Sequence, residues 1–332
     1  MNRTPANARI SIVVLTYNRV DELLATLERL LALPDNPPIF VADNGSTDDT
    51  VARVNASFPE VRVIQCGGNL GAAGRNRAAA CVETEYIAFC DDDTWWAPGS
   101  LERAVQLLDA WPQVGVLNAR VAVGANNATD PTCAVMRASP LVDDELPGPA
   151  LIGYMAGACV FRTALFRELG GYEERLFIGG EEALVSLDVL ASGHAIVYCD
   201  QLTVHHHPSP ARDSALRRRM LARNAAWTAW LRLPAREAAS ATLRAFGVFA
   251  KERTVVRDGV QLLRALGWAF RRRRVVPAQV LDMRERVRLA ERKVEVAARH
   301  ADAHVAAHVA AHVAARAQAE ARRARGNVDA QT

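Results

Sequence analysis

With 332 residues, half of them hydrophobic, the chain is long enough for one large domain with an appendage or for two domains. Its six cysteines include no C-x-x-C pair, which argues against a zinc site and a disulfide framework and favours a reducing compartment. The net charge is only +3, but residues 201–332 hold 26 Arg and Lys against 11 Asp and Glu. This basic part is expected to face an anionic partner or the acidic N-terminal part of the chain, or to form a solvated basic helix bundle.

Residues 10–123 alternate between strand and helix patterns. Apolar runs predict strands at 10–15, 38–42, 61–65, 86–90 and 114–123, and helical spacing predicts helices at 21–33, 47–56, 72–82 and 100–110. The first apolar run is too short for a secretory signal or a membrane span, so we expect a cytoplasmic protein. Repeated βα units require a mainly parallel sheet with helices on both faces, and such sheets bind ligands at the carboxyl ends of their strands.

The pattern is less regular after residue 123. Residues 124–150 are rich in Gly, Pro, Asn and Asp and are predicted to form a long loop with a strand near 132–137. Further strands are expected at 151–161, 195–198 and 202–205, and further helices at 163–169 and 179–191. Beyond Pro208 the chain is rich in Arg and Ala. We therefore expect an α/β domain at 8–210, a basic helical region at 211–296 and a low-complexity tail at 297–332.

Three consecutive carboxylates, Asp91, Asp92 and Asp93, follow the apolar strand that begins at Tyr86. Burying adjacent negative charges without a cation is costly, so the cluster indicates a divalent metal with oxygen ligands. Because alternate side chains of a strand share a face, Asp91 and Asp93 are expected to point together while Asp92 turns away. The competing interpretation is that these carboxylates belong to a loop and cap the next helix.

Two further polar clusters stand at strand ends. Asp43 could accept an N–H of a nucleotide base, although the Asn-Gly and Ser-Thr residues after it also suit an ordinary turn and helix cap. Residues 67–76 form a glycine-rich turn in which backbone N–H groups and Arg75 could approach phosphates. The first strand is followed by no glycine, and a Walker lysine is missing, so dinucleotide-binding and P-loop chemistry are disfavoured.

Taken together and in this order, the motifs resemble those of the family 2 glycosyltransferases with the GT-A fold. The matching stretches cover about the first third of the chain: VVLTYNR (13–19), ADNGSTDDT (42–50), NLGAAGRNRA (69–78) and FCDDDTWWAPGSL (89–101). A looser match continues through residues 157–182 to HHHPSP at 205–210. The resemblance implies a Rossmann-like mixed, mainly parallel sheet, followed by the basic helical region.

The resemblance also implies roles for individual residues. The nucleotide-sugar donor would be bound by side chains at the strand ends, namely Thr16, Tyr17 and Arg19 at the nucleoside, Asp43 at the base, Asn69 and Arg75 near the ribose and phosphates, and Asp92 at the sugar or ribose. The metal would be held by the D-x-D carboxylates and by one histidine of the run at 205–207, namely by Asp91, Asp93 and His206.

The general base is expected at residues 180–182, which read Gly-Glu-Glu where the family usually has Gly-Glu-Asp. Glu182 stands at the position of the usual Asp, but its extra methylene makes Glu181 a rival. Both residues would also suit the start of the following helix, where anions favour the positive end of the dipole. Trp95 and Trp96 are expected either to form an acceptor platform or to lie in the core.

The activity that the resemblance implies is an inverting, metal-dependent transfer of a sugar from a nucleotide-diphosphate sugar to an acceptor hydroxyl. Mg²⁺ or Mn²⁺ would neutralise the leaving diphosphate while a carboxylate removes the proton of the hydroxyl. The acceptor is left open between a lipid-linked one and a saccharide. The alternative from another class is a catalytically silent nucleotide-sugar-binding or scaffold protein, which the departure at Glu182 suggests.

Two patterns remain in the C-terminal part. Apolar residues followed by Arg271–Arg274 suit a helix that lies on an anionic membrane surface, or one that packs on the first domain or on a second subunit of a homo-oligomer. These apolar residues are Leu243, Phe246, Phe249, Val256, Val260, Leu263 and Phe270. The tail repeats histidine every four residues at His300, His304, His308 and His312, which indicates a metal-binding pair or, more simply, a solvated helix or short coil. We expect no nucleic-acid partner.

Overall fold

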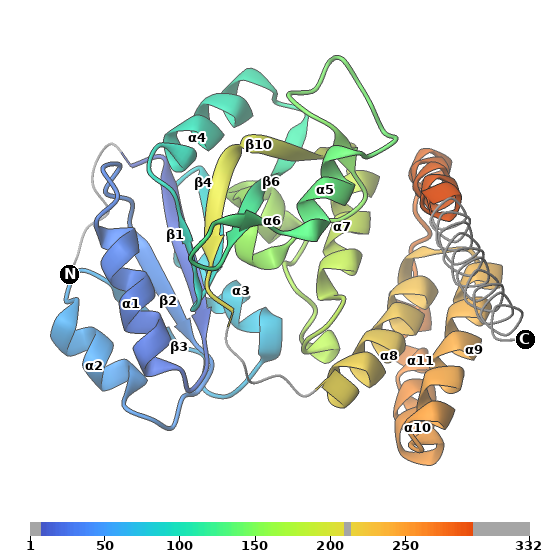
Figure 1. Ribbon diagram of the computed structural model, residues 1–332. Helices are drawn as coiled ribbons and strands as arrows, with labels where there is room; N and C mark the ends of the chain where they lie inside the picture. Colours follow the sequence, from blue (N-terminus) through green and yellow to red (C-terminus); the bar gives the residue numbers. More distant parts are fainter. Residues whose placement is uncertain (1–7, 209–213, 295–332) are drawn as a thin grey trace, which may run out of the picture. The chain divides into compact units, whose positions relative to one another are not determined.

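The computed structural model describes residues 8–208 and 214–294, and its centre is a ten-stranded mixed sheet (Figure 1). The main path through the sheet is β3-β2-β1-β4-β9-β6-β10-β5, with β7 paired to β6 and β8 paired to β10. The strands are β1 (Ile10–Thr16), β2 (Ile39–Asp43), β3 (Arg62–Gln65), β4 (Tyr86–Asp91), β5 (Thr94–Trp96), β6 (Val114–Val123), β7 (Ala128–Thr129), β8 (Ala150–Leu151), β9 (Cys159–Arg162) and β10 (Ala195–His206). The predicted α/β fold with a mixed sheet is confirmed.

The first four strands run parallel to one another and are connected by helices. Those of this half are α1 (Val20–Leu31), α2 (Thr50–Ser57), the 3₁₀ turn η1 (Gly71–Ala73) with α3 (Gly74–Ala79), and α4 (Ser100–Ala110). The central strands are buried on both faces, which explains their continuous apolar runs. Helix α2 begins three residues later than predicted because the Asp48 carboxylate accepts the Thr50 N–H at 3.1 Å.

The second half of the sheet differs from the sequence expectations in two places. The strand predicted at 151–161 is wrong over most of its length, because the 3₁₀ turn η2 (Ala156–Ala158) separates β8 from β9. Strand β9 then runs antiparallel between β4 and β6. The two strands predicted at 195–198 and 202–205 are one strand, β10, whose pairing with β6 shifts register between Cys199 and Thr203.

The segment 124–150 contains a helix where a strand was expected. Helix α5 (Pro131–Arg137) starts after Asp130, whose side chain accepts the Thr132 N–H at 2.8 Å. Proline suits the first helical position because it has no N–H to leave unpaired there. The Asp-Pro-Thr sequence was therefore a helix-start signal that the strand prediction overlooked.

Helices α6 (Thr163–Glu168) and α7 (Glu181–Ala191) follow in the chain, with the short turn η3 (Glu174–Leu176) between them. Between these helices and β4 lies an aromatic cluster in which Phe89, Phe161, Phe166 and Tyr172 meet at ring-centroid distances of 5.0 to 6.3 Å. Edge-to-face contacts of this kind stabilise a core beyond the area that they bury. The cluster fixes the loop between α6 and α7 against the sheet.

The C-terminal part is helical, as predicted, over the residues that the structure describes. Its helices are α8 (Ser214–Arg232), α9 (Ala235–Lys251), α10 (Val255–Arg264) and α11 (Leu266–Arg271), and residues 278–294 are also helical. Helices α8–α11 belong to the same compact unit as the sheet, which extends to Met283, whereas residues 284–294 belong to a second unit. The histidine repeat of the tail lies outside the described residues.

The apolar residues expected on one face of this part divide between two environments. Phe249 is fully buried and packs against Phe246, whereas Leu243 and Val256 are 74% and 80% exposed. Breaks between α9, α10 and α11 prevent a single continuous stripe. Among the described residues no helix combines the length and apolar character needed to cross a membrane.

Candidate active site

The polar residues predicted at the strand ends meet at one edge of the sheet. In the register of the parallel strands, Thr16 lies beside Asp43, and Leu15 lies beside Asp91. Parallel strands bring their carboxyl ends to the same edge, so clusters that are far apart in the sequence become neighbours. The sequence prediction that this edge gathers the polar residues is confirmed.

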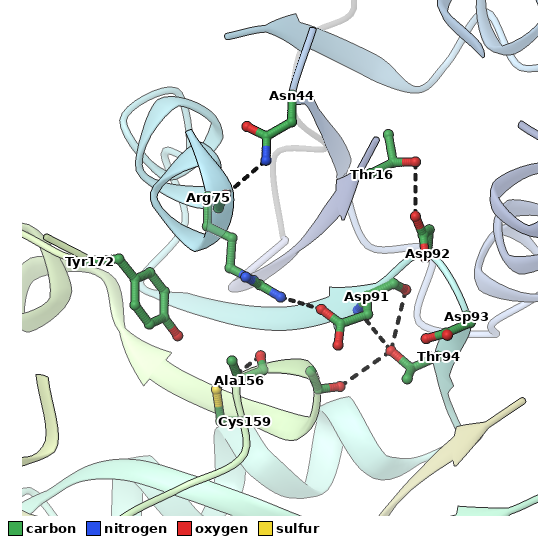
Figure 2. Close-up of polar contacts among 12 residues, drawn as sticks. Thr16, Asn44, Arg75, Asp91, Asp92, Asp93, Thr94, Ala156, Cys159 and Tyr172 are labelled. Atoms are coloured by element: carbon green, nitrogen blue, oxygen red, sulfur yellow. Dashed lines mark hydrogen bonds and ion pairs between the residues drawn. The ribbon is translucent and has the colours of Figure 1, made fainter. Parts of the chain in front are cut away.

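The three aspartates do not alternate as expected, because β4 ends at Asp91 and residues 92–93 form a turn before β5. Arg75 forms an ion pair with Asp91 (Figure 2). Arg19 contacts Asp92 at 2.5 Å and Asp93 at 3.4 Å. Asp92 and Asp93 therefore share a cation, and Asp91 has a different one. The strand rule stops where the strand ends, so it no longer supports the expectation that Asp91 and Asp93 point together, which stays a prediction.

Arg75 is the buried cation of the site. Its side chain is only 4% exposed, and its guanidinium lies 5.7 Å from the ring of Tyr172. On the other side of Asp91, a Cβ placed on Gly157 would lie 2.5 Å from an oxygen of the Asp91 carboxylate. Gly157 is thus needed for the close approach of η2 to the strand end, and it was not identified from the sequence.

Asp92 is nearly buried beneath the strand ends. Thr16 donates its hydroxyl to one oxygen of the Asp92 carboxylate at 3.1 Å, and Thr26 donates to the Asp92 backbone carbonyl at 2.8 Å. Burial raises the pKa of Asp92 to about 7, although the Arg19 guanidinium opposes the shift. A buried carboxylate held in this way is a fixed hydrogen-bond acceptor at the floor of the site.

Asp93 and His206 form the part of the site that fits a metal. His206 Nε2 lies 3.7 Å from a carboxylate oxygen of Asp93, which is too long for a hydrogen bond. Two ligands at about 2.1 Å from one ion are at most about 4.2 Å apart, so this pair can share a small divalent cation. The described residues hold no group of three or more metal-ligating side chains, so further ligands would be donor phosphates and water, as is usual for Mg²⁺.

The other two histidines of the run face away from Asp93. The rings of His205 and His207 each lie 5.4 Å from the ring of Trp95. The Arg29 guanidinium also stacks on Trp95, 4.0 Å from the centroid of its ring. His206 is thus the histidine of the run whose ring lies beside Asp93, and its role as a metal ligand stays a prediction. Trp95 is already engaged by these side chains, and its acceptor role stays a prediction.

Trp96 occupies the opposite face of β5 from Trp95. Its side chain is fully buried in the hydrophobic core, as the alternation of a strand requires. A ring without exposed surface cannot stack on a sugar. The acceptor role expected for Trp96 is therefore wrong, and the alternative interpretation as a core residue holds.

The two candidate bases begin helix α7 after Gly180, which has a left-handed backbone with φ of 82°. Glu181 is buried, and one of its carboxylate oxygens has no hydrogen-bond partner. Burial and the neighbouring Glu182 raise the pKa of Glu181 to about 7. Burial also raises the pKa of Glu182. The Arg75 guanidinium opposes this shift, and the Asp91 carboxylate adds to it. The charge of Asp91 therefore acts on Glu182.

Helix α8 clamps the loop that leads into α7, which sequence reasoning did not anticipate. Asn224 is fully buried and donates its amide to the backbone carbonyls of Leu176 at 2.7 Å and Gly179 at 2.8 Å. Arg223 donates to the carbonyl of Leu176 as well. An isolated Asn in an Arg- and Ala-rich helix carries no local signal of this role, because its partners lie 45 and 48 residues away.

The predicted nucleoside residues at the same edge differ in exposure, since Thr16 and Asp43 are buried. The Asp43 carboxylate accepts the Ser46 N–H at 3.1 Å, so the turn expected after β2 is present as well. Tyr17 is 41% exposed, and Asn69 is also exposed. Asn44, which the sequence prediction passed over within its D-N-G-S motif, donates to the Gly71 carbonyl at 2.8 Å and so holds the glycine-rich turn in place.

Comparison with known sequences gives consistent matches. Residues 11–170 match Glycosyl transferase family 2. An N-acetylglucosaminyl-diphospho-decaprenol L-rhamnosyltransferase of Mycobacterium tuberculosis is 25% identical over 246 residues, which are 62% of this chain and 79% of the relative. A UDP-Glc:alpha-D-GlcNAc-diphosphoundecaprenol beta-1,3-glucosyltransferase of Escherichia coli is 34% identical over 104 residues, which are 30% of this chain and 41% of the relative.

Solved structures share the fold. A mannosyltransferase of Pyrobaculum calidifontis, in complex with GDP-Man and Mn²⁺, has a TM-score of 0.53 and 19% identity, over 80% of this chain and 72% of that one. TarS residues 1–349 of S. aureus, in complex with UDP-GlcNAc, has a TM-score of 0.53 and 20% identity, over 83% of each chain. At these identities the likeness shows the fold alone.

Proposed function

Because residues 11–170 belong to glycosyl transferase family 2 and the chain has the GT-A fold, the protein is a glycosyltransferase. We propose that it moves a sugar from a nucleotide-diphosphate sugar to an acceptor hydroxyl. The transfer would proceed with inversion and with Mg²⁺ or Mn²⁺. The observation that carries the proposal is the turn Asp91–Asp93, in which each carboxylate contacts Arg19 or Arg75 and Asp93 also faces His206. The glutamates that begin α7 lie within electrostatic reach of Arg75.

The donor would lie over the carboxyl ends of β1, β2 and β4. Asp43 and Thr16, which are neighbours in register, would bound the nucleoside, with the exposed ring of Tyr17 beside it. Arg19 and Arg75 would attract the diphosphate and the sugar, because a guanidinium binds phosphate oxygens in a bidentate way. Each of these cations already contacts an aspartate of the turn, so the donor would meet a site whose cations are held in place.

The charge balance of the site supports a divalent cation. Five carboxylates, at Asp91–Asp93 and at Glu181 and Glu182, stand near two guanidiniums, and burial raises the pKa of three of the five. Asp93 and His206 would hold the ion, with donor oxygens and water as further ligands. When bound, such an ion neutralises the charge that develops on the leaving diphosphate.

Glu182 would act as the general base. A base must stand within hydrogen-bond reach of the acceptor hydroxyl, on the side of the sugar away from the leaving group. Glu182 lies in the first turn of α7, where the charges of Arg75 and Asp91 act on its carboxylate, and Asn224 fixes the loop before it. Glu181 has less exposed surface than Glu182, which suits direct contact with an acceptor less well.

The acceptor class is proposed from the relatives, whose names specify sugars carried on diphosphoprenols. We propose a lipid-diphosphate acceptor and peripheral attachment to an anionic membrane surface. Helix α10 supports attachment, because Val256 and Leu263 are exposed on it and the cations Arg253 and Arg257 are exposed beside them. Apolar groups in the interface combined with nearby arginines are the usual basis of such binding.

Sedimentation with vesicles tests the attachment. The wild-type chain should sediment with phosphatidylglycerol vesicles and remain in solution with phosphatidylcholine vesicles. Val256→Ser/Leu263→Ser should weaken sedimentation, whereas Val142→Ser, at an exposed valine 74% accessible in the first domain, should not. Failure of the wild type to bind both kinds of vesicle would refute membrane attachment.

A thermal-shift screen followed by a transfer assay tests the enzyme function. The chain is heated with UDP, GDP or dTDP and with their sugar conjugates, each with Mn²⁺ or with chelator. A ligand that binds the folded state raises the Tm by mass action, so one nucleotide class should stabilise the chain and should do so only with the ion. Hydrolysis of that donor with Mn²⁺ then separates an enzyme from a silent binding protein. Absence of any shift across the three nucleotides would count against the proposal.

A further inference from the structure

A second cleft, of about 520 Å³, lies beside α7 and contains none of the aspartates or glutamates of the candidate active site. Its walls are the loop 169–174, the side of α7 that carries Leu184 and Asp188, the end of α8, and α11 with the residues after it. A volume of this size is typical of pockets for small molecules. Five arginines line it: Arg232, Arg271, Arg272, Arg273 and Arg274.

Three of these arginines are already engaged by the protein. Arg232 pairs with Asp188 through two of its guanidinium nitrogens, Nε and Nη2, and Arg272 contacts Glu173 at 2.6 Å. Arg273 donates to the backbone carbonyl of Leu233 at 2.6 Å. Acidic side chains of the cleft thus hold Arg232 and Arg272, and a backbone carbonyl holds Arg273.

The other two arginines have no such partner. Across residues 8–208 and 214–294, no acidic side chain lies in ion-pair contact with Arg271 or Arg274, and both side chains are exposed at the cleft. The backbone around them is anchored, since the Arg274 N–H donates to the Leu231 carbonyl at 2.8 Å. Two unpaired guanidiniums on a fixed backbone are a suitable arrangement for an anion with several oxygens.

The cleft and the candidate base lie along the same helix. Leu184 and Asp188, which line the cleft, follow Glu182 by two and six residues in α7. At about 1.5 Å of rise per residue, Asp188 lies about 9 Å along the helix axis from Glu182. One sugar residue and its diphosphate can span that separation.

We propose that this arginine cleft binds the diphosphate group of the acceptor, with Arg271 and Arg274 as its main contacts. The proposal rests on the proposed glycosyl transfer, and it assigns the carrier diphosphate of the acceptor to a site separate from that of the donor diphosphate. The donor diphosphate would bind with the ion at the strand ends, whereas the acceptor diphosphate would bind to guanidiniums without an ion.

Calorimetric titration of the full chain with inorganic pyrophosphate, in chelator and at low salt, tests the assignment. The cleft variant is Arg271→Gln/Arg274→Gln, and the matched control is Arg236→Gln/Arg264→Gln, which removes the same charge from exposed arginines outside the cleft. The wild type and the control should bind pyrophosphate with similar affinity, and the cleft variant should bind it at least about tenfold more weakly. All three proteins should bind the nucleoside diphosphate with Mn²⁺ equally well.

Several outcomes would overturn the assignment. One is the absence of measurable pyrophosphate binding by the wild type, and another is an equal loss in the cleft variant and the control. A third is a cleft variant that still binds pyrophosphate but no longer sediments with phosphatidylglycerol vesicles, because the arginines would then serve a lipid headgroup. Nucleoside diphosphate binding and donor hydrolysis are measured separately, so failure at the cleft is distinguishable from failure of the proposed function.

Discussion

Replacing Glu182 by Gln tests the candidate active site most directly. The amide keeps the shape of the side chain at the start of α7 but cannot accept the proton of the acceptor hydroxyl. Loss of a general base usually costs ~10²–10⁴-fold in rate, so kcat should fall by that factor. Donor binding with Mn²⁺, measured by calorimetry, should stay unchanged because none of the proposed donor residues lies in α7. Release of nucleoside diphosphate during transfer measures the rate.

The pH profile of the wild type gives a second reading of the same residue. Burial raises the pKa of Glu182, and only the ionised carboxylate can act as a base. The rate should therefore fall with decreasing pH at values above the ordinary Glu pKa of about 4.3. Glu182→Gln should lack this acidic limb. Near wild-type kcat in the variant, or an unchanged limb, would refute the assignment.

Glu181→Gln is the matched control, because it changes the neighbouring carboxyl in the same way. The pKa of Glu181 is raised to about 7 by burial, so the folded state holds its proton more tightly than the unfolded state does. Wild-type stability from this group therefore falls as pH rises from about 4 to about 7. The variant should keep most of its activity and should have a higher Tm than the wild type, with a difference that grows over this range. If Glu181→Gln is inactive and Glu182→Gln is active, the roles are reversed.

Three further substitutions test other parts of the site. Asp93→Asn should abolish Mn²⁺-dependent transfer and should weaken the Mn²⁺ binding seen by electron paramagnetic resonance. Activity of the wild type that persists undiminished in excess chelator would contradict the metal assignment. Gly157→Ala should lower kcat/KM by on the order of 10²-fold, because the added Cβ would lie 2.5 Å from the Asp91 carboxylate and must displace that carboxylate. Unchanged kinetics would argue against the close approach of residue 157 to Asp91. Asn224→Ala should lower the free energy of unfolding by about 1–3 kcal/mol, because it leaves the buried carbonyls of Leu176 and Gly179 without this donor. An unchanged urea midpoint would argue against the role of Asn224 in holding the loop before α7.

Much of the fold follows from local sequence. Continuous apolar runs predicted β1, β2, β4 and β6 to within a residue or two, because these strands are buried on both faces and are therefore mainly apolar. Helix α4 begins and ends at the predicted residues. The location of the site also followed, since polar residues directly after buried parallel strands must meet at one edge of the sheet. Family resemblance then supplied roles for these residues.

The partners of the charged side chains were decided by the tertiary structure. Arg75 binds Asp91, and Arg19 binds Asp92 and Asp93, because β4 ends inside the run of aspartates and the turn redirects the last two. Where a strand ends depends on its neighbours in the sheet, which lie outside any local window. The same reason hid Gly157, whose small size matters only where η2 approaches Asp91.

The contribution of the C-terminal helices was the least accessible to sequence reasoning. Composition predicted basic helices, and these are present, but it did not reveal that Asn224 of α8 holds the loop before the candidate base. It also did not reveal that Arg271 and Arg274 line a cleft with residues of α7. Helical periodicity determines which residues share a face. What that face contacts is determined by the packing of α8 against α7 and of α11 against α8, which depends on residues far apart in the chain.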